Sequence, residues 1–501
     1  MPIGSRPTMS GEVDREELSD VLRDRREKLE RLREAGIDPF PPEFGEREEI
    51  GEVRAAHEGL APGIETESRH RVAGRLVGRR GHGKACFLDL RDATGQIQLH
   101  AREDLLGEEP YKVLVELDLG DIIGVEGTAL ATRRGGELSL AIDHWRLLAK
   151  SLRPPPDKFH GLEDVETRYR QRELDLIANE ESRDLFTKRA RTVSEVRRWL
   201  DERGFVEVET PVLQPLYGGA LARPFTTHHN ALDRDLYLRI ATELYLKRLV
   251  VGGIDKVYEL GKDFRNEGIS HKHNPEFTML EWYEACADYE STARRVETMV
   301  AEVAERVLGT TVVERDGVSL DFAPPWNRIS FREAIREGSG IDIAEHPTRE
   351  ALSAAIGTEP DPEEGWGKLV DGLLSKHVEP QLIQPTFVVD YPIELSPFAK
   401  SHRSEEGLVE RFEAFAGGME IANGFTELND PDEQRRRFEQ QAEELARGDE
   451  EAQPYDEDFV AALEQGMPPT GGVGIGIDRL VMLLTGAKSV REVVLFPAMR
   501  S

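Results

Sequence analysis

The sequence predicts a multidomain α+β chain in which a small five-stranded β-barrel precedes a larger domain of helices and strands. The chain has 501 residues, which at roughly 100–200 residues per domain suggests about three domains. Hydrophobic residues make up 39% and charged residues 32%, which supports sizeable cores and excludes a mainly disordered chain. The pattern also changes along the chain: short alternating segments with glycine-rich turns at 69–150 give way to long helical patterns after about 165.

The charge and the cysteine content limit which cellular compartments and binding partners are compatible with the chain. The formal charge is −31, from 65 Lys and Arg against 96 Asp and Glu, and it opposes non-specific coating of a polyanion. Nucleic acid stays possible as a partner if basic residues gather on one face. No apolar stretch approaches the roughly 20 residues of a membrane span, and the polar start predicts no secretory signal. Two cysteines, Cys86 and Cys286, are read as isolated thiols, so we expect a cytoplasmic location and no membrane association.

Residues 1–68 form a predicted N-terminal extension. Within it, residues 14–35 are densely charged with leucines at helical spacing, which predicts an amphipathic helix ended by Gly36 and Pro39. Its basic residues fit either of two roles, contact with a phosphate backbone or a solvated, ion-paired face.

Residues 69–150 read as five short strands, with a helix-like piece over Tyr111–Leu117 before the fourth. Five strands with a helix in that place are the pattern of an OB-type barrel, a common oligonucleotide-binding fold. Residues 151–164 follow as a stiff linker that contains Pro154–Pro156.

The remaining residues, 165–501, form the larger predicted domain. Amphipathic patterns predict helices over 182–203 and 290–307, and a polar helix over 431–447. After Gly204, the run FVEVET (205–210) predicts a strand that ends at Pro211. Residues 345–380 are acidic and interrupted by proline, which predicts a helical insertion.

Three segments of this domain carry residues suited to chemistry. The first is VYELGKDFRNEG…HNPEFTMLEWYEA (257–285), read as two antiparallel strands joined by a loop at about 268–274. Arg265 and Glu267 would share one face of the first strand. The second strand would place on one face Phe277, Met279, Glu281 and Tyr283. A guanidinium fork suits a carboxylate or phosphate, and an aromatic ring can stack on a base. The alternative is an ion-paired surface hairpin.

The second segment is GGVGIGIDRLVMLL (471–484). Its glycines remove side chains from a strand, which predicts that something flat or bulky approaches the backbone. The spacing is not GxGxxG, so a dinucleotide fold is disfavoured. Asp478 and Arg479 begin the following helix, from which Arg479 could reach a phosphate. Close packing of a glycine-rich strand is the alternative.

The third segment is RFEAFAGGMEIANGFTELND (411–430), with Gly417–Gly418 as a hairpin turn. Glu413 and Glu420 lie on opposite arms near the turn, where they could hold a hard cation through oxygen ligands. One face beyond the turn would carry Ile421, Asn423, Phe425 and Glu427. Taken alone, this is also compatible with an ordinary acidic hairpin. The histidines of the pair 228–229 and of the HKH run at 271–273 have no Cys or His partner at zinc spacing, which argues against a zinc site.

Together these segments resemble a known family. GFVEVETPVL (204–213), FRNEGISHKHNPEFTMLEWY (264–283) and GIGIDRLVMLL (474–484) resemble motifs 1, 2 and 3 of class II aminoacyl-tRNA synthetases. Within that class, residues 218–253 and NGFTELND (423–430) are similar to bacterial-type lysyl-tRNA synthetases. The resemblance covers about 15–500. It implies an OB-fold anticodon-binding domain joined to an antiparallel β-sheet catalytic domain flanked by helices, and a homodimer through motif 1.

The resemblance also implies the activity and the site. The family uses ATP and Mg²⁺ to convert L-lysine to lysyl-adenylate, and then transfers the lysyl group to the 3′-terminal adenosine of tRNA(Lys). Charge neutralisation and in-line positioning dominate this chemistry, so no general base is assigned. The implied catalytic residues are Arg265 and Arg479. The implied ATP-binding residues are Arg265, Glu267, His273, Asn274, Phe277 and Arg479. The implied lysine-binding residues are Gly219, Glu243, Arg265, Glu281, Tyr283, Asn423 and Glu427. The implied Mg²⁺ ligands are Glu413 and Glu420. The implied anticodon-binding residues are Arg79, Phe87, Gln98 and Glu137.

Within this set, Gly219 and Glu243 would receive the α-amino group, and Glu281 and Glu427 would receive the ε-ammonium. Tyr283 and Asn423 are expected to hydrogen-bond the two ε-ammonium carboxylates and to hold them apart.

Other functions compete with this one. Aspartyl or asparaginyl specificity would need a cation in the side-chain pocket, where Glu281 and Glu427 are anions. Relatives that lysylate a protein lack a barrel like that at 69–150, and those that lysylate lipid carry membrane spans. A non-catalytic RNA-binding regulator should have lost Arg265 or Arg479, and both are present.

Overall fold

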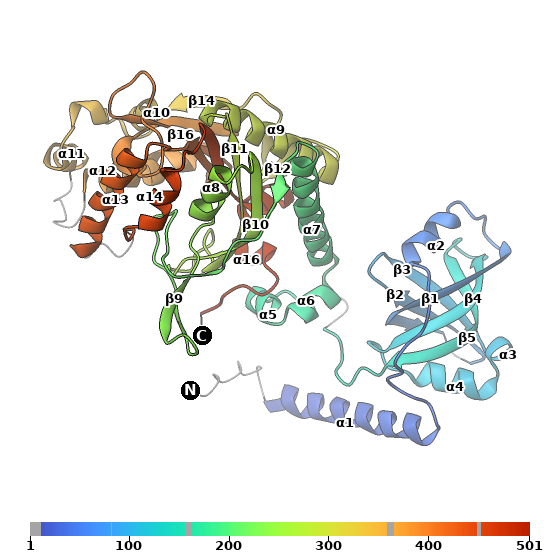
Figure 1. Cartoon of the computed structure of the whole chain (residues 1–501). Helices are drawn as coiled ribbons and strands as arrows, with labels where there is room; N and C mark the ends of the chain where they lie inside the picture. The colour runs from blue at the N-terminus through green and yellow to red at the C-terminus, as the bar shows by residue number, and fades with distance from the viewer. Residues whose placement is uncertain (1–11, 82, 157–161, 358–364, 448–451, 501) are drawn as a thin grey trace. The chain divides into compact units, whose positions relative to one another are not determined.

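The computed structural model describes residues 12–81, 83–156, 162–357, 365–447 and 452–500. The chain forms two compact units, Met1–Arg183 and Asp184–Arg500, which Figure 1 shows in blue to cyan and in green to red. The unit boundary lies later than the domain boundary predicted at 165. Helices α5 (Val165–Arg170) and α6 (Arg172–Ala178) belong to the first unit, where Leu176 and Ile177 line a hollow together with barrel residues.

The first unit contains the predicted OB-type barrel. Its strands are β1 (Glu65–Arg80), β2 (Ala85–Arg91), β3 (Gln96–Arg102), β4 (Ile122–Ala131) and β5 (Leu138–Ala149). They close in the order β1-β2-β3-β5-β4, with β3 and β5 parallel. Helices α3 (Glu103–Leu106) and α4 (Glu108–Glu116) precede β4. Alternate side chains such as Leu88, Leu90 and Ile97 fill the interior, so that Phe87 and Gln98 face outward.

Several basic side chains of the N-terminal helix α1 (Glu12–Glu34) bind partners within this unit. A short helix, α2 (Ile50–Ala56), follows α1. The Arg25 guanidinium donates to the carbonyls of Leu119 and Ser151, each at 3.0 Å. Lys28 pairs with Asp118 at 2.7 Å, and Arg33 pairs with Glu30 within the helix at 2.8 Å. Lys28 and Arg33 are thus ion-paired, and Arg25 is hydrogen-bonded to backbone carbonyls within the unit.

The second unit is built on a sheet of eight strands in the order β14-β15-β16-β17-β18-β11-β10-β6. The pairs β10–β6 and β14–β15 are parallel and the others antiparallel. The strands are β6 (Val206–Glu207), β10 (Lys256–Phe264), β11 (Glu276–Ala285), β14 (Asn327–Ser330), β15 (Thr386–Pro392), β16 (Leu408–Ala416), β17 (Met419–Thr426) and β18 (Thr470–Gly476). Two small sheets join β12 (Val312–Arg315) to β13 (Val318–Asp321), and β7 (Leu213–Gln214) to β9 (Arg234–Leu238) and β8 (Thr226–His229).

Helices flank the large sheet. Helices α7 (Glu180–Asp201), α9 (Tyr289–Leu308) and α15 (Ile477–Thr485) pack a shared core against one sheet face, through residues such as Leu280, Trp282 and Ile475. The alternate residues of β11 point to the opposite face, which carries the cavity described below. Helix α8 (Glu243–Val251) lies beside β10 and β11. The remaining helices are α10 (Phe331–Ser339), α11 (Arg349–Ile356), α12 (Trp366–Leu373), α13 (Pro431–Ala446), α14 (Glu457–Leu463) and α16 (Val490–Val493).

Two local predictions need correction. Arg265 and Glu267 lie beyond the end of β10 and not on a strand. The Arg265 N–H still donates to the Pro275 carbonyl at 3.0 Å, but the next N–H, of Asn266, turns to the Arg223 carbonyl at 2.8 Å, and the ladder ends there. The strand predicted from the run FVEVET is only the two residues of β6, Val206–Glu207.

The predicted insertion at 345–380 contains helices α11 and α12, followed by short helical turns up to Gln381; its residues 358–364 lie outside the described part. Across the described residues, no helix combines the length and the apolar character that crossing a membrane requires.

Candidate active site

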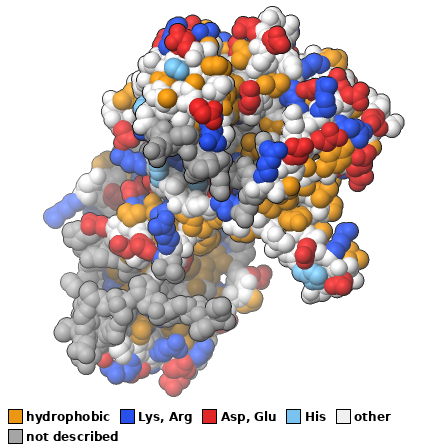
Figure 2. All heavy atoms as spheres, turned by 90° about the vertical axis from the view of Figure 1, so that its left-hand side faces the viewer, with side chains coloured by type: hydrophobic (Ala, Val, Ile, Leu, Met, Phe, Trp, Pro, Cys, Tyr) orange, Lys and Arg blue, Asp and Glu red, His pale blue; other side chains and the backbone are white. Residues whose placement is uncertain are grey.

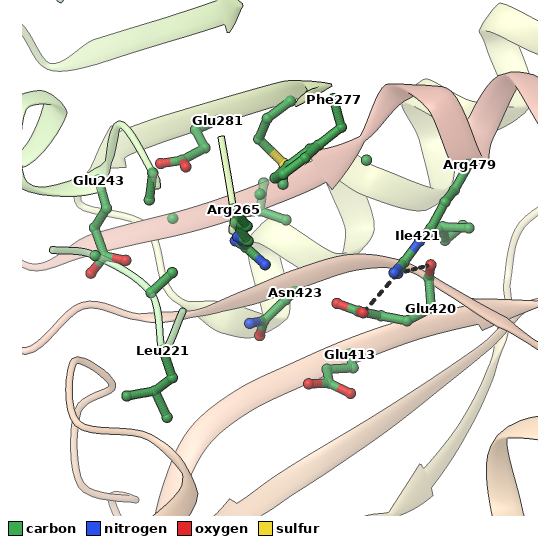
Figure 3. A pocket seen from close by; sticks show the side chains of 18 of the residues that line it. Leu221, Glu243, Arg265, Phe277, Glu281, Glu413, Glu420, Ile421, Asn423 and Arg479 are labelled. Atoms are coloured by element: carbon green, nitrogen blue, oxygen red, sulfur yellow. Dashed lines mark hydrogen bonds and ion pairs between the residues drawn. The ribbon is translucent and has the colours of Figure 1, made fainter. Parts of the chain in front are cut away.

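A cavity of about 400 Å³ opens on the sheet face formed by β11, β16, β17 and β18, beside the 265–275 loop and α8. Every residue predicted to bind ATP, lysine or Mg²⁺ lines this cavity. Figure 3 shows Glu243 and Glu281 at one side and Arg479 with Glu420 at the other, with Arg265 between them. We call these sides the acidic end and, after the ligand that the sequence predicts there, the phosphate end.

The acidic end contains three buried carboxylates, those of Glu243, Glu281 and Glu427. The Glu281 carboxylate accepts hydrogen bonds from the Thr242 N–H and the Tyr283 hydroxyl, each at 3.1 Å. Burial, together with the charges of Asp263 and Glu243, raises the pKa of Glu281 to about 8. Burial also raises the pKa of Glu427 well above its usual range and raises that of Glu243. Three buried carboxylates close to one another favour retention of a proton in this pocket.

One residue of this end was absent from the sequence prediction. The Lys247 ammonium, on α8, pairs with Glu243 at 2.5 Å and also with Glu427. Its side chain is fully buried. Burial alone would lower the pKa of Lys247, but the two carboxylates outweigh it and raise the pKa, so the ammonium stays charged. The available signal was the i,i+4 spacing of Glu243 and Lys247 in a mainly apolar helix.

The glycine-rich strand β18 forms the floor between β11 and β17. A Cβ at Gly472 would overlap the Glu427 carboxylate and the Tyr283 ring, whereas one at Gly474 would meet nothing closer than the Met279 sulfur at 3.6 Å. The close approach predicted for this strand is therefore real at Gly472, but the approaching groups are the pocket's own side chains.

At the phosphate end, the guanidiniums of Arg265 and Arg479 face the cavity. Arg265 lies 5.2 Å from the centroid of the Phe277 ring. Arg479 donates to Glu420 Oε2 at 2.9 Å, and its other terminal nitrogen lies 3.2 Å from His273 Nε2. Burial and the Arg479 charge lower the pKa of His273, which favours the neutral ring.

Two residues predicted to bind ATP, Asn274 and Glu267, differ from Arg265 and Arg479 in how their side chains are placed. The Asn274 amide donates to the Glu276 carbonyl at 2.5 Å and accepts from the Ala498 N–H at 3.1 Å, so its side chain ties the loop to the C-terminal segment. Glu267 is exposed at the rim.

Glu413 and Glu420 come from paired strands β16 and β17. A bulge at Ile421 breaks the alternation of β17 and turns Glu420 to the same side as Asn423. Burial raises the pKa of Glu413 to about 7 although Arg411 opposes this, and Arg479 outweighs burial to lower the pKa of Glu420. Two carboxylates suit a hard cation whose other ligands are phosphates and water; within the described ranges there is no ready-made cluster of three or more metal-binding side chains.

The predicted partners of Asn423 need correction. Tyr283 does donate to Glu281, but the Asn423 carbonyl oxygen accepts from Arg411 Nε at 2.9 Å. Arg411 is fixed in turn by the Leu395 carbonyl and the Ser396 hydroxyl, each at 2.7 Å. The amide therefore offers its NH₂ group to the cavity, which suits a carboxylate better than an ammonium.

Two further lining residues that the sequence did not single out position their neighbours: Arg411 orients Asn423, and the Gln453 side-chain oxygen accepts from the Gly219 N–H at 3.0 Å.

The predicted anticodon residues lie on the outer face of the barrel. Phe87 stacks on His100 with ring centroids 4.7 Å apart, and the Gln98 carbonyl oxygen accepts from the Ser139 hydroxyl at 2.9 Å. A shallow hollow is lined by Arg54, Arg80, Asp89, Gln96, Gln98 and Glu137. Arg79 instead donates to the carbonyls of Val115 and Leu117 at the end of α4. Arg79 therefore supports the end of α4 and does not line the hollow, whereas Arg80 and Asp89 do line it.

Comparison with known proteins agrees with this geometry. A family model described as tRNA synthetases class II (D, K and N) matches residues 164–500, and one described as an OB-fold nucleic acid binding domain matches residues 70–148. The fold and site are therefore those of a class II tRNA synthetase.

The chain is 52% identical to the lysine–tRNA ligase of Pelotomaculum thermopropionicum over 97% of this chain and 96% of that protein. It is 54% identical to that of Moorella thermoacetica (96% and 98%) and 52% identical to that of Synechococcus sp. strain CC9311 (96% and 99%). The chain belongs to the lysine–tRNA ligase family.

Family membership confirms the resemblance and the fold class that the sequence predicts. It also decides between the open alternatives, since these relatives are neither aspartyl nor asparaginyl enzymes by name.

Proposed function

We propose that the two ends of the cavity divide the work of lysine activation between them. As a member of its family, the chain is an ATP-dependent ligase that joins lysine to tRNA. The acidic end would hold the ammonium groups of lysine, and the phosphate end would hold ATP. The observation that carries this proposal is that one cavity is lined by three buried carboxylates and two guanidiniums, with Arg479 at the side opposite Glu243 and Glu281 and Arg265 between them (Figure 3).

At the acidic end, Glu243 and the Gly219 carbonyl would receive the α-ammonium of lysine, and Glu281 and Glu427 the ε-ammonium. A buried ammonium needs fixed anions because it leaves its water behind. Between the ends, Arg265 and the Asn423 NH₂ group are placed to hold the substrate carboxylate. This arrangement would aim one carboxylate oxygen toward the α-phosphate.

At the phosphate end, Phe277 would stack on adenine while Arg265 and Arg479 neutralise the phosphates. Attack of the lysine carboxylate on phosphorus depends on charge neutralisation and alignment, so no protein group needs to remove a proton. Glu413 and Glu420 would hold Mg²⁺, which when bound would offset further phosphate charge. Arg479 would then exchange its Glu420 partner for a phosphate oxygen.

On the barrel, Phe87 and Gln98 would read an anticodon base of tRNA(Lys) by stacking and hydrogen bonding. Phe87→Ala should weaken tRNA binding by about 1–3 kcal/mol and leave lysine and ATP binding unchanged. A loss of adenylate formation of similar size would contradict an anticodon role for this face.

We also propose a cytoplasmic homodimer. Figure 2 shows exposed hydrophobic side chains, in orange, gathered on the larger unit. Around motif 1 the exposed apolar residues are Val206, Val212, Leu213 and Leu216, and exposed apolar patches commonly mark protein interfaces. Sedimentation that gives the monomer mass at micromolar concentration would refute the dimer.

The test of the proposal is ATP–pyrophosphate exchange with each of the twenty amino acids, without tRNA. Lysine should be the preferred substrate of the wild type, and Glu281→Gln should raise the KM for lysine without changing the KM for ATP. Equal effects on both substrates would contradict the division between the ends.

A further inference from the structure

We propose that Lys247 is a positioning residue that serves as the resident counter-ion of the lysine pocket. Its ammonium would hold Glu243 and Glu427 apart and set the charge of the acidic end to match the two ammonium groups of free lysine. This inference rests on the proposed function, because it requires that the acidic end receives lysine.

The geometry places Lys247 between the two carboxylates and behind the cavity. Its ammonium lies 2.5 Å from Glu243 Oε1 and also pairs with Glu427 Oε2. Glu243 and Glu427 line the cavity, whereas Lys247 does not, and its side chain is fully buried. The rings of Phe398 and Phe425 lie 5.2 and 5.4 Å from the ammonium, a distance at which aromatic faces attract cations. Lys247 therefore acts on the substrate only through its carboxylate partners.

A count of charges explains why such a residue is needed. Glu243, Glu281 and Glu427, when ionised, carry three negative charges, and Lys247 offsets one of them. Two negative charges then remain for the two ammonium groups of lysine. An amino acid with one ammonium leaves an anion buried and unpaired, which costs binding energy. The same count disfavours any ligand that lacks a second positive charge.

The titratable groups that face this cluster come from three directions. They are Glu243 on α8, Glu281 and Tyr283 on β11, and Glu427 after β17, with Asp263 of β10 adding its charge to Glu281. Without Lys247, Glu243 and Glu427 would lose the ammonium that pairs with both of them. The carboxylates would then bind an additional proton, and lysine would have to displace it on binding.

The experiment compares Lys247→Met with Arg248→Met. Arg248 is the neighbouring positive charge on the same helix, and it does not line the cavity. Lys247→Met should raise the KM for lysine in ATP–pyrophosphate exchange by at least about 30-fold, the usual result of removing one partner of a buried charge pair. The KM for ATP should stay within about threefold, as it should for both substrates in Arg248→Met. Calorimetry of lysine binding in buffers of different ionisation enthalpy should show about one additional proton released by Lys247→Met.

The double variant Lys247→Met, Glu427→Gln separates charge balance from packing. It restores two negative charges in the empty pocket, so its KM for lysine should be lower than that of Lys247→Met alone. If Lys247 only fills space, the double variant should be at least as impaired as either single variant, and proton release should not change. Either result would overturn the proposal.

These outcomes remain distinct from a failure of the proposed function. If Glu281→Gln and Glu427→Gln leave lysine kinetics unchanged, the acidic end does not bind lysine at all. If those variants are impaired while Lys247→Met is within about threefold of wild type, the lysine site stands and the counter-ion role is wrong.

Discussion

At the acidic end two of the three carboxylates share one ammonium and the third has no cationic partner among the described ion pairs, whereas at the phosphate end each carboxylate is paired with its own guanidinium. The acidic end keeps an excess of negative charge that its buried residues cannot relieve by moving into water. The phosphate end is closer to neutral, and its Arg479–Glu420 pair must open before either partner can bind a ligand. In the proposed function, lysine would therefore meet a preformed charge pattern, whereas ATP would have to rearrange one.

Arg265→Ala should give the largest effect, because this guanidinium lies between the two ends and is proposed to touch both reacting groups. Loss of one donor to a developing charge typically lowers the rate by about 10²–10³-fold. We expect at least that loss in lysine-dependent ATP–pyrophosphate exchange. Arg294→Ala, an exposed arginine on α9, is the matched control and should behave as wild type. Near-normal exchange by Arg265→Ala would leave motif 2 as a structural hairpin.

Glu427→Gln tests the acidic end alone. Leaving Lys247 with one partner fewer and the ε-ammonium with one anion fewer should lower kcat/KM for lysine by at least about 30-fold. Norleucine, which lacks the ε-charge, should be discriminated against less strongly by this variant than by wild type. Glu276→Gln removes a carboxylate outside the cavity on the same strand as Glu281 and should change neither value. A change of less than about threefold for Glu427→Gln would contradict the preformed charge pattern.

Gly472→Ala and Gly474→Ala compare two glycines of one strand. The added methyl group at Gly472 would overlap Glu427 and Tyr283, and overpacking of this kind typically costs about 1–3 kcal/mol. We expect a raised KM for lysine and a lower thermal midpoint for Gly472→Ala. Gly474→Ala should keep the stability of wild type, since its Cβ would meet only ordinary contacts. Equal destabilisation by both changes would show that the strand as a whole, and not the carboxylate, requires glycine.

The last prediction concerns pH. With the pKa of Glu281 raised to about 8 by burial, this group is a neutral acid below that pH and a carboxylate above it. Lysine binding requires the carboxylate, so the affinity for lysine should rise by up to about tenfold per unit between pH 6 and 8 and then level off. Glu281→Gln should flatten this profile. A wild-type affinity that is independent of pH over this range would show that Glu281 is already ionised in the empty pocket.

The sequence predicts some parts of the site better than others, for physical reasons. The period of two along β11 correctly places Phe277, Met279, Glu281 and Tyr283 on one face, because a regular strand fixes where its side chains point. The same rule fails on β17, where the bulge at Ile421 reverses the alternation and turns Glu420 inward. A bulge depends on the partner strand, and no local pattern records it.

Contacts between residues that are distant in the sequence also cannot be predicted from local patterns. The hydrogen bond from Arg411 that turns Asn423 crosses between neighbouring strands, and the Lys247–Glu427 pair joins residues far apart in the chain. The tight packing of Gly472 against Glu427 likewise depends on which strands become neighbours. A pattern of residue types identifies the strands and helices but not these contacts.

The position of β18 in the sheet has a consequence for the order in which the enzyme becomes active during its own synthesis. This strand pairs with β11 on one side and β17 on the other, although it is made after both. Until Thr470–Gly476 has left the ribosome, β11 and β17 have nothing between them, and the two halves of the cavity stay separate. A chain that lacks Thr470–Gly476 therefore has no complete pocket, so we expect no lysine activation before this strand has been made.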